Sequence, residues 1–178
     1  MAWFYFRASR LALRTGDDAA LRAAAGPRSV KHLLDAAAGR RVAAELGTGA
    51  GWSALALVLA DRRRTVTTFD PTEWPTRDQY LELAPRGARE RLTVREVEGH
   101  LAPADFDGAP DLLFIDSSHD RGETQASVRA WRERLAPGAC VVFHDYDNPA
   151  WPGVAEAVEE LGLDGETPGG SLFVWHTG

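Results

Sequence analysis

The sequence predicts an α/β fold in which a doubly wound, mostly parallel sheet carries helices on both faces. After residue 40, short apolar runs alternate with helical segments, which is typical of βαβ units. Most of these runs end on an acidic or polar residue, and a glycine-rich loop follows the first of them. Because open parallel sheets bind ligands beyond the carboxyl ends of their strands, we expect the chemistry at those ends.

The individual elements follow from apolar periodicity and from turn residues. Residues 1–40 are rich in Ala and Leu and predict helices, interrupted at Gly16 and at Gly26-Pro27. The periodicity leaves the pairing of residues 162–170 open. The expected strands are 41–46, 65–69, 92–97, 111–115, 139–143 and 171–175, and the expected helices are 52–60, 77–84, 122–135 and 154–161.

The length of 178 residues suits one domain over 1–178, with a helical N-terminal segment (1–40) and a sheet-bearing core (41–178). Cys140 is the only cysteine, which excludes an intramolecular disulfide and suits a reducing compartment. No apolar run approaches the roughly 20 residues that span a bilayer, and the first residues lack the pattern of a signal peptide. We therefore expect a cytoplasmic protein with no membrane partner.

The charge of the chain is unevenly distributed. The formal net charge is -6, which argues against a nucleic-acid partner, since such proteins usually present a basic face. Residues 1–40 hold seven basic and three acidic residues, so they carry +4 and the remainder carries -10. This basic segment is either a solvated helix face or a surface for an acidic partner. The aromatic run Trp3, Phe4, Tyr5 and Phe6 favours core packing, with a substrate lid or a homodimer contact as alternatives.

The glycine loop runs from Glu45 to Ser53 with the sequence ELGTGAGWS, directly after the first strand. Glycine allows a positive φ and lets a ligand approach the backbone closely. A dinucleotide site needs G-x-G-x-x-G, but here the third glycine falls one place early at Gly51, and Trp52 occupies the position that needs glycine. No Gly-Lys-Ser/Thr follows, so a phosphate-binding P-loop is also excluded.

This loop resembles motif I of the class I S-adenosylmethionine (SAM) dependent methyltransferases, in which an acid precedes G-x-G-x-G. That resemblance implies a seven-stranded Rossmann-like sheet and SAM as the cofactor. Asp70, at the end of the next strand, would accept the ribose hydroxyls, and Ser53 would contact the methionine carboxylate at a helix N-terminus. Gly99 and His100 stand where the family binds adenine. Trp52 either closes over the ligand or packs into the core. The implied cofactor-binding residues are Glu45, Gly47, Thr48, Gly49, Gly51, Trp52, Ser53, Asp70, Gly99, His100 and Asp116.

Two later strand ends resemble those of catechol-type and small bacterial O-methyltransferases that tailor natural products. They read Asp116-Ser117-Ser118-His119 and His144-Asp145-Tyr146. The resemblance covers about residues 30–160 and implies methyl transfer to a small-molecule acceptor, most simply a hydroxyl oxygen. It makes His119 the candidate general base, three residues past Asp116 where catechol-type enzymes carry lysine, with Asp116 and Asp145 as further catalytic residues. Histidine has an intrinsic pKa near 6.5, which suits that role.

The same strand ends leave two alternatives open: a divalent-metal site formed by Asp116, His144 and Asp145, or a metal-free site in which Asp116 binds the SAM amine or caps the next helix. A metal ion lowers the pKa of a hydroxyl, and oxygen ligands suit Mg²⁺. His144 favours Mn²⁺, Fe²⁺ or Zn²⁺ instead, and the asparagine that follows the second acid in catechol-type enzymes is replaced by Tyr146. Asp147-Asn148 is a displaced acid-amide pair. Successive strand residues point to opposite faces, so His144 and Asp145 share a site only if the strand has ended before them.

Three other functions remain compatible with these motifs. A non-catalytic SAM-binding module would bind the cofactor without turnover, and the short chain leaves few residues for a substrate cap. An NAD(P)-binding oxidoreductase is disfavoured by Trp52 and by the lack of a Tyr-x-x-x-Lys pair. A nucleic-acid or protein methyltransferase is disfavoured by the acidic charge.

Overall fold

In the computed structural model, which describes residues 2–178, a seven-stranded sheet has the order β3-β2-β1-β4-β5-β7-β6. All neighbouring pairs from β3 to β5 are parallel, whereas β7 is antiparallel to both β5 and β6. The strands are β1 (Val42–Leu46), β2 (Thr65–Phe69), β3 (Leu92–Arg95), β4 (Leu112–Ile115), β5 (Cys140–Phe143), β6 (Gly165–Gly169) and β7 (Leu172–His176).

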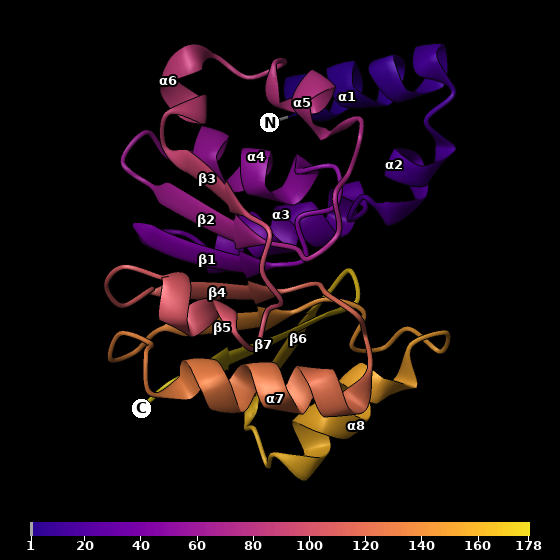
Figure 1. The fold of residues 1–178 in the computed structure, drawn as a ribbon. Coiled ribbons are helices and arrows are strands. Elements are labelled where there is room, and N and C mark those ends of the chain that lie inside the picture. Colours follow the sequence, from indigo (N-terminus) through magenta and orange to yellow (C-terminus); the bar gives the residue numbers. More distant parts are fainter. Residues whose placement is uncertain (1) are drawn as a thin grey trace.

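Helices cover both faces of the sheet, as the sequence predicts (Figure 1). Because side chains alternate along a strand, Leu112 and Phe114 of β4 pack into one core, while Leu113 and Ile115 pack into the other. The first core is covered by α1 (Ala2–Thr15), α2 (Asp18–Ala23), α3 (Pro27–Ala36), α4 (Trp52–Ala60), α5 (Arg77–Leu81) and α6 (Arg86–Arg89). The second core lies under the 3₁₀ helix η1 (Ala102–Asp105), α7 (Arg121–Arg132) and α8 (Pro152–Glu160).

The observed elements differ from the expected ones mainly at their ends. The helix expected at 77–84 stops at Leu81, because Ala84 precedes Pro85 and the proline ring disfavours helical geometry there. The strand expected at 92–97 ends at Arg95, where its pairing with Phe69 of β2 ends. Residues 165–169, which periodicity left open, form the edge strand β6 against β7, with a register shift between Glu166 and Gly169.

The aromatic run at the start of α1 divides between the core and the surface. Phe4 is fully buried, and the Tyr5 ring packs edge-on against Trp52 with ring centroids 5.6 Å apart. Trp3 and Phe6 face outward and remain more than half exposed. Within residues 2–178, no helix combines the length and apolar character needed to cross a membrane.

Candidate functional site

A cavity of about 450 Å³ opens at the carboxyl ends of the parallel strands, where β1 and β4 meet and the strand order reverses. Such a switch point is the usual ligand site of doubly wound sheets, and the volume lies in the usual range of small-molecule sites. Of the predicted site residues, Glu45, Gly51, His144 and Asp145 do not line this cavity. The predicted residues that do are Gly47, Thr48, Gly49, Trp52, Ser53, Asp70, Gly99, His100, Asp116 and His119.

Gly47 brings the glycine loop against the end of β4. Its φ is +95°, and a Cβ placed on it would lie 1.9 Å from the backbone oxygen of Asp116. Its amide donates to the carbonyl of Phe69 at the end of β2. Only glycine fits this position, because both the positive φ and the contact with Asp116 exclude a side chain.

Asp70 connects the end of β2 to the glycine loop. One carboxylate oxygen accepts from the amide of Gly49 at 2.8 Å, and the other accepts from the amide of Thr72 at 2.9 Å. A carboxylate offers about four lone-pair sites, so Asp70 keeps acceptor capacity toward the cavity. It therefore both shapes the loop and remains able to bind hydroxyl groups.

Arg77 is a loop-supporting residue that the motifs did not reveal. It is buried, donates from Nε to the carbonyl of Gly49 at 2.8 Å, and donates from Nη2 to the carbonyl of Thr72 at 3.0 Å. The same Nη2 lies 4.0 Å from Asp70. Arginine in a helix usually indicates a solvated face, so only the tertiary contact identifies its role.

The start of α4 closes one side of the cavity. Gly51 caps this helix with a φ of +81°, and Ser53 is almost fully buried beside the cavity. Trp52 also borders the cavity, but its ring is only 4% exposed and packs between Tyr5 and Tyr80. The indole therefore belongs mainly to the core that joins α1, α4 and α5, rather than to a movable cover.

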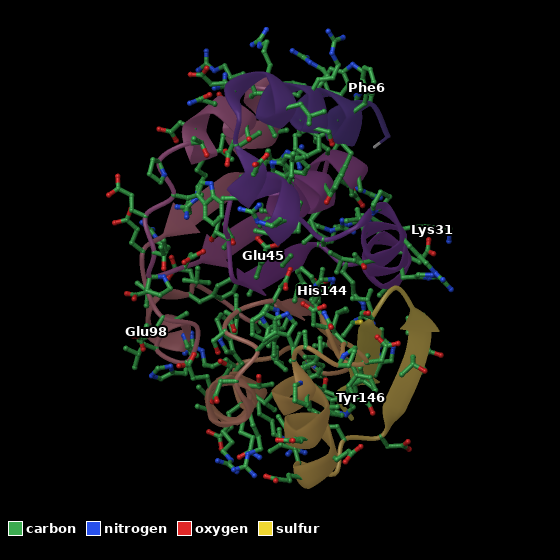
Figure 2. The ribbon with its side chains drawn as sticks, turned by 90° about the vertical axis from the view of Figure 1, so that its right-hand side faces the viewer. Phe6, Lys31, Glu45, Glu98, His144 and Tyr146 are labelled. Carbon is green, nitrogen blue, oxygen red and sulfur yellow. The ribbon has the colours of Figure 1, made fainter. Side chains whose placement is uncertain are left out.

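Glu45 is fully buried at the centre of the molecule, close to the level of His144 (Figure 2). Neither carboxyl oxygen forms a hydrogen bond of standard geometry. Burial raises the pKa of Glu45 to about 8, although the hydroxyls of Ser53 and Thr68 favour its charged form. The side chain predicted to touch the cofactor thus lies outside the cavity, and its raised pKa favours the protonated form at neutral pH.

We expect the Glu45→Gln variant to become more stable than the wild-type protein as the pH rises. The pKa of Glu45 is higher in the folded chain than its ordinary value of 4.5, so its contribution to stability is full below pH 4.5 and is lost as the pH rises through about 8. Glutamine cannot ionise and does not lose this contribution. Denaturant unfolding of both proteins from mildly acidic to mildly alkaline pH measures the difference, and a constant difference across that range would contradict the prediction.

Four side chains converge beside the cavity: Asp116, His119, His144 and Asp145. The Nδ1 atom of His144 lies 2.9 Å from Oδ1 of Asp116 and 3.3 Å from Oδ2 of Asp145. The Nε2 atom of His119 lies 3.3 and 3.1 Å from the same two oxygens. One ligand atom from each residue falls within 4.8 Å of the others, so the structure places His119 beside the three predicted metal ligands.

Backbone geometry at the strand ends makes this convergence possible. β5 ends at Phe143, and Asp145 has a φ of +56°, which turns its side chain toward the same centre as that of His144. His119 has a φ of +60°. A non-glycine residue in the left-handed region costs on the order of 1–3 kcal/mol, and such residues concentrate at functional sites. The condition for His144 and Asp145 to share a site is thus met.

The two histidines and the two aspartates of the cluster shift one another's pKa values. Burial opposes charge on all four groups, but the contacts with Asp116 and Asp145 raise the pKa of His119 to about 9 and that of His144 to about 10. The same contacts lower the pKa of both carboxyl groups. Without a cation, the two carboxylates therefore favour the protonated form of both imidazoles. This differs from the sequence-based expectation for His119, which used the pKa of isolated histidine.

A loop after β5 covers the cluster. Asn148 donates from Nδ2 to Asp145 at 2.8 Å, so the displaced acid-amide pair is in fact Asp145 with Asn148. The ring of Trp151 stacks on His119 at 5.0 Å between centroids. Gly153 packs so closely on the His119 loop that a Cβ would lie 2.7 Å from the carbonyl oxygen of His119. Sequence analysis missed Trp151, because its contact depends on this approach of α8.

Gly99 and His100 border the cavity on the β3 side. Trp131 of α7 donates to the carbonyl of Gly99 at 2.9 Å, which holds the loop against the second core. Nε2 of His100 lies 3.5 Å from Glu98, which also lines the cavity and is half exposed. Gly99 and His100 follow β3, whereas Asp116 follows β4. The strands β2 and β1 lie between β3 and β4 in the sheet.

Comparisons with known proteins agree with this architecture. A family model described as a methyltransferase domain matches residues 44–146, which is 103 of the 178 residues. No curated protein matches the sequence. The match to the family model contains the glycine loop, Asp70 and the whole cluster of Asp116, His119, His144 and Asp145.

Several solved structures share the fold. An O-methyltransferase from Bacillus cereus in complex with SAH is 17% identical, with a TM-score of 0.69 over 95% of this chain and 90% of that one. The O-methyltransferase TomG from Streptomyces achromogenes, in complex with SAM, is 19% identical, with a TM-score of 0.67 over 87% and 82% of the two chains. An O-methyltransferase family protein from Burkholderia thailandensis is 18% identical, with a TM-score of 0.61 over 83% of this chain. The present chain spans about half of that protein, 55% of its length.

Three findings point to the same family. They are the seven-stranded sheet with an antiparallel β7, the glycine loop at the switch point of that sheet, and the match to the family model. The chain belongs to the methyltransferase-domain family and has the Rossmann-like fold of class I SAM-dependent methyltransferases.

Proposed function

We propose that this protein transfers the methyl group of SAM to a hydroxyl oxygen of a small-molecule acceptor, with a divalent cation held by Asp116, His144 and Asp145 beside His119. The observation that carries the proposal is the position of Asp116 and His119, which line the cavity and also belong to the cluster. One cavity thus joins a ligand-binding glycine loop to a group of metal-ligating side chains. The SAM- and SAH-bound structures that share the fold support the choice of cofactor.

The cavity residues fit the parts of SAM. Gly47 and Gly49 expose bare backbone, and Asp70 retains acceptor sites for the ribose hydroxyls. Ser53 lies in the first turn of α4, where backbone amides favour a carboxylate. Gly99 and His100 border the region proposed for adenine.

The cluster fits a divalent cation because its two imidazoles and two carboxylates are ordinary metal ligands at close spacing. The mixed nitrogen and oxygen set favours Mn²⁺, Fe²⁺ or Zn²⁺ over Mg²⁺. When bound, the cation would lower the pKa of the acceptor hydroxyl and orient it. Two carboxylates would offset the positive charge of that cation, and His144 would release its proton on ligation.

The reaction forms a bond between the acceptor oxygen and the methyl carbon while the bond from that carbon to sulfur breaks, leaving SAH. The hydroxyl proton must leave the oxygen. His119 is the proposed acceptor of this proton, since its ring lies at the boundary of the cavity and the cluster and its lone pair is not given to the cation in this proposal. Trp151 holds the plane of that ring, and the carboxylates of Asp116 and Asp145 stabilise its charged form.

The cofactor assignment is tested by calorimetric titration of SAH into the wild-type protein and the Asp70→Ala variant. We expect saturable binding that weakens by at least about tenfold in the variant, because it loses both the ribose acceptor and the contact with the Gly49 amide. Asp164→Ala, an exposed acid between α8 and β6, is the matched control and should bind normally. Equal affinity in the wild-type and Asp70→Ala proteins would contradict the assignment.

Catalysis is tested separately with isotope-labelled SAM and a panel of acceptors that carry vicinal oxygens, with Mg²⁺ or Mn²⁺ added. Labelled product that depends on the cation supports the full proposal. Cofactor binding without transfer to any acceptor would instead indicate a non-catalytic SAM-binding module.

A further inference from the structure

The outer face of α1 carries an unpartnered stripe of aromatic, aliphatic and basic side chains. Trp3, Phe6 and Leu13 are 53%, 62% and 70% exposed. Arg7, Arg10 and Arg14 are also exposed and share this face of the helix, because they follow one another at spacings of three and four residues. The opposite face of α1 already supplies Phe4, Ala8 and Ala12 to the core. Stability therefore requires no apolar residues on the outer face, and exposed apolar patches of this kind usually mark interaction sites.

Two of these arginines stack on aromatic rings of the same helix. The guanidinium of Arg7 lies over the ring of Trp3 at 4.9 Å, and that of Arg10 lies over Phe6 at 5.7 Å. A guanidinium stacked on an aromatic ring keeps its N–H groups free at its edge, where they can bind carboxylates in pairs. No acidic residue occurs between Ala2 and Thr15, so α1 offers these arginines no partner of its own.

A groove of about 560 Å³ runs beside this stripe. It is lined by Arg7, Arg10, Leu11, Leu13, Arg14 and Leu83, so both basic and aliphatic groups border it. The groove lies away from the cofactor cavity and shares no lining residue with it. Phe6, on the exposed face of α1, lies at the outer edge of the molecule (Figure 2).

We propose that this groove and stripe form a docking surface for an acidic segment of a partner protein, one that pairs carboxylates with the three arginines and inserts aliphatic side chains beside Leu11, Leu13 and Leu83. Charge complementarity supports this occupant, since the surface is basic and carries no acid. The distribution of charge would orient the encounter, because residues 1–40 carry +4 and the remainder carries -10. Exposed glutamates lie on α8, at the opposite end of the molecule from α1 (Figure 1).

Two other occupants fit less well. Symmetric pairing with a second copy would place six arginines in one interface with no acid from either α1, which like-charge repulsion disfavours. A lipid surface would contact the convex stripe, but it could not fill the groove between α1 and Leu83.

The test uses a fluorescently labelled synthetic peptide in which Glu residues recur every three or four positions and Leu residues recur at the same spacing beside them. A second peptide replaces each Glu with Lys. We expect the acidic peptide to bind the wild-type protein saturably and to weaken with added salt, while the Lys peptide does not bind. The triple variant R7E/R10E/R14E should bind the acidic peptide at least about tenfold more weakly. R62E/R63E, which reverses the charge of two exposed arginines outside the stripe, is the matched control and should bind the acidic peptide as the wild type does.

W3A/F6A tests the apolar part of the surface and should weaken binding without removing the salt dependence. SAH titration into each variant confirms that the cofactor site is intact, so a loss of peptide binding reports on the α1 surface alone. No saturable binding of the acidic peptide to the wild type, or equal binding by the triple variant, would overturn the proposal. Tighter binding to phosphatidylglycerol vesicles than to the peptide, or a dimer in sedimentation that the triple variant loses, would replace the partner protein by a lipid surface or by a second copy.

Discussion

The Asp116→Ala variant is expected to lose methyl transfer by about a thousandfold in kcat/KM and to lose saturable binding of Mn²⁺. Asp116 contacts both His119 and His144, and it also borders the cavity proposed for SAM. Its removal therefore affects cation binding and the orientation of the proposed base together. Calorimetric titration of Mg²⁺ and then Mn²⁺ into SAH-loaded protein, followed by steady-state kinetics, measures both effects.

The fold should survive this substitution. The imidazoles of His119 and His144 can lose their protons once the carboxylate is gone, so no buried charge is left uncompensated. Asp147→Ala is the matched control, because this neighbouring acid is exposed and should leave Mn²⁺ binding and activity unchanged. If Asp147→Ala lost metal binding and Asp116→Ala retained it, the metal site would be assigned to the wrong acid.

The Gly47→Ala variant is expected to lose several kcal/mol of stability and most of its affinity for SAH. The added Cβ would overlap the backbone oxygen of Asp116, at a position where the positive φ already disfavours alanine. Relief of that overlap must move either the glycine loop or the end of β4, and both border the cavity. Thermal unfolding and SAH titration together report the two losses.

The Gly39→Ala variant measures how much stability is lost through the positive φ alone, without the steric overlap that is present at Gly47. Gly39 has a similar φ of +80°, but a Cβ placed there meets no atom within 4 Å. We expect this control to cost only about 1 kcal/mol and to bind SAH normally. Equal losses of stability and affinity in both variants would mean that the contact between Gly47 and Asp116 has no special importance.

Much of the fold could be predicted from sequence because its signals are local. The β-branched run at 65–69 and the mainly aliphatic run at 111–115 are too short for helices, and they form the partly buried strand β2 and the buried strand β4 of the expected sheet. The edge strand β6 could not be predicted in this way. Its sequence Gly165–Gly169 is polar and exposed, and it forms a strand only because β7 offers a free edge.

The sequence by itself determined where the cavity lies. The glycines of the first strand-helix turn and the polar residues that end the parallel strands both mark the switch point of the sheet. It also brought Asp116 and Asp145 near each other, because they follow the paired strands β4 and β5. These features depend on chain order and on short-range conformational preference, which a sequence records directly.

Only the tertiary structure decided the arrangement around those residues. The left-handed backbone of His119 and Asp145 brings two imidazoles and two carboxylates to one centre, and that proximity raises the histidine pKa values above their ordinary range. Arg77 supports the glycine loop and Trp151 stacks on His119 from elements distant in the chain. Such contacts depend on how helices pack onto the sheet, and the free energy of that packing is shared among many residues with no local motif.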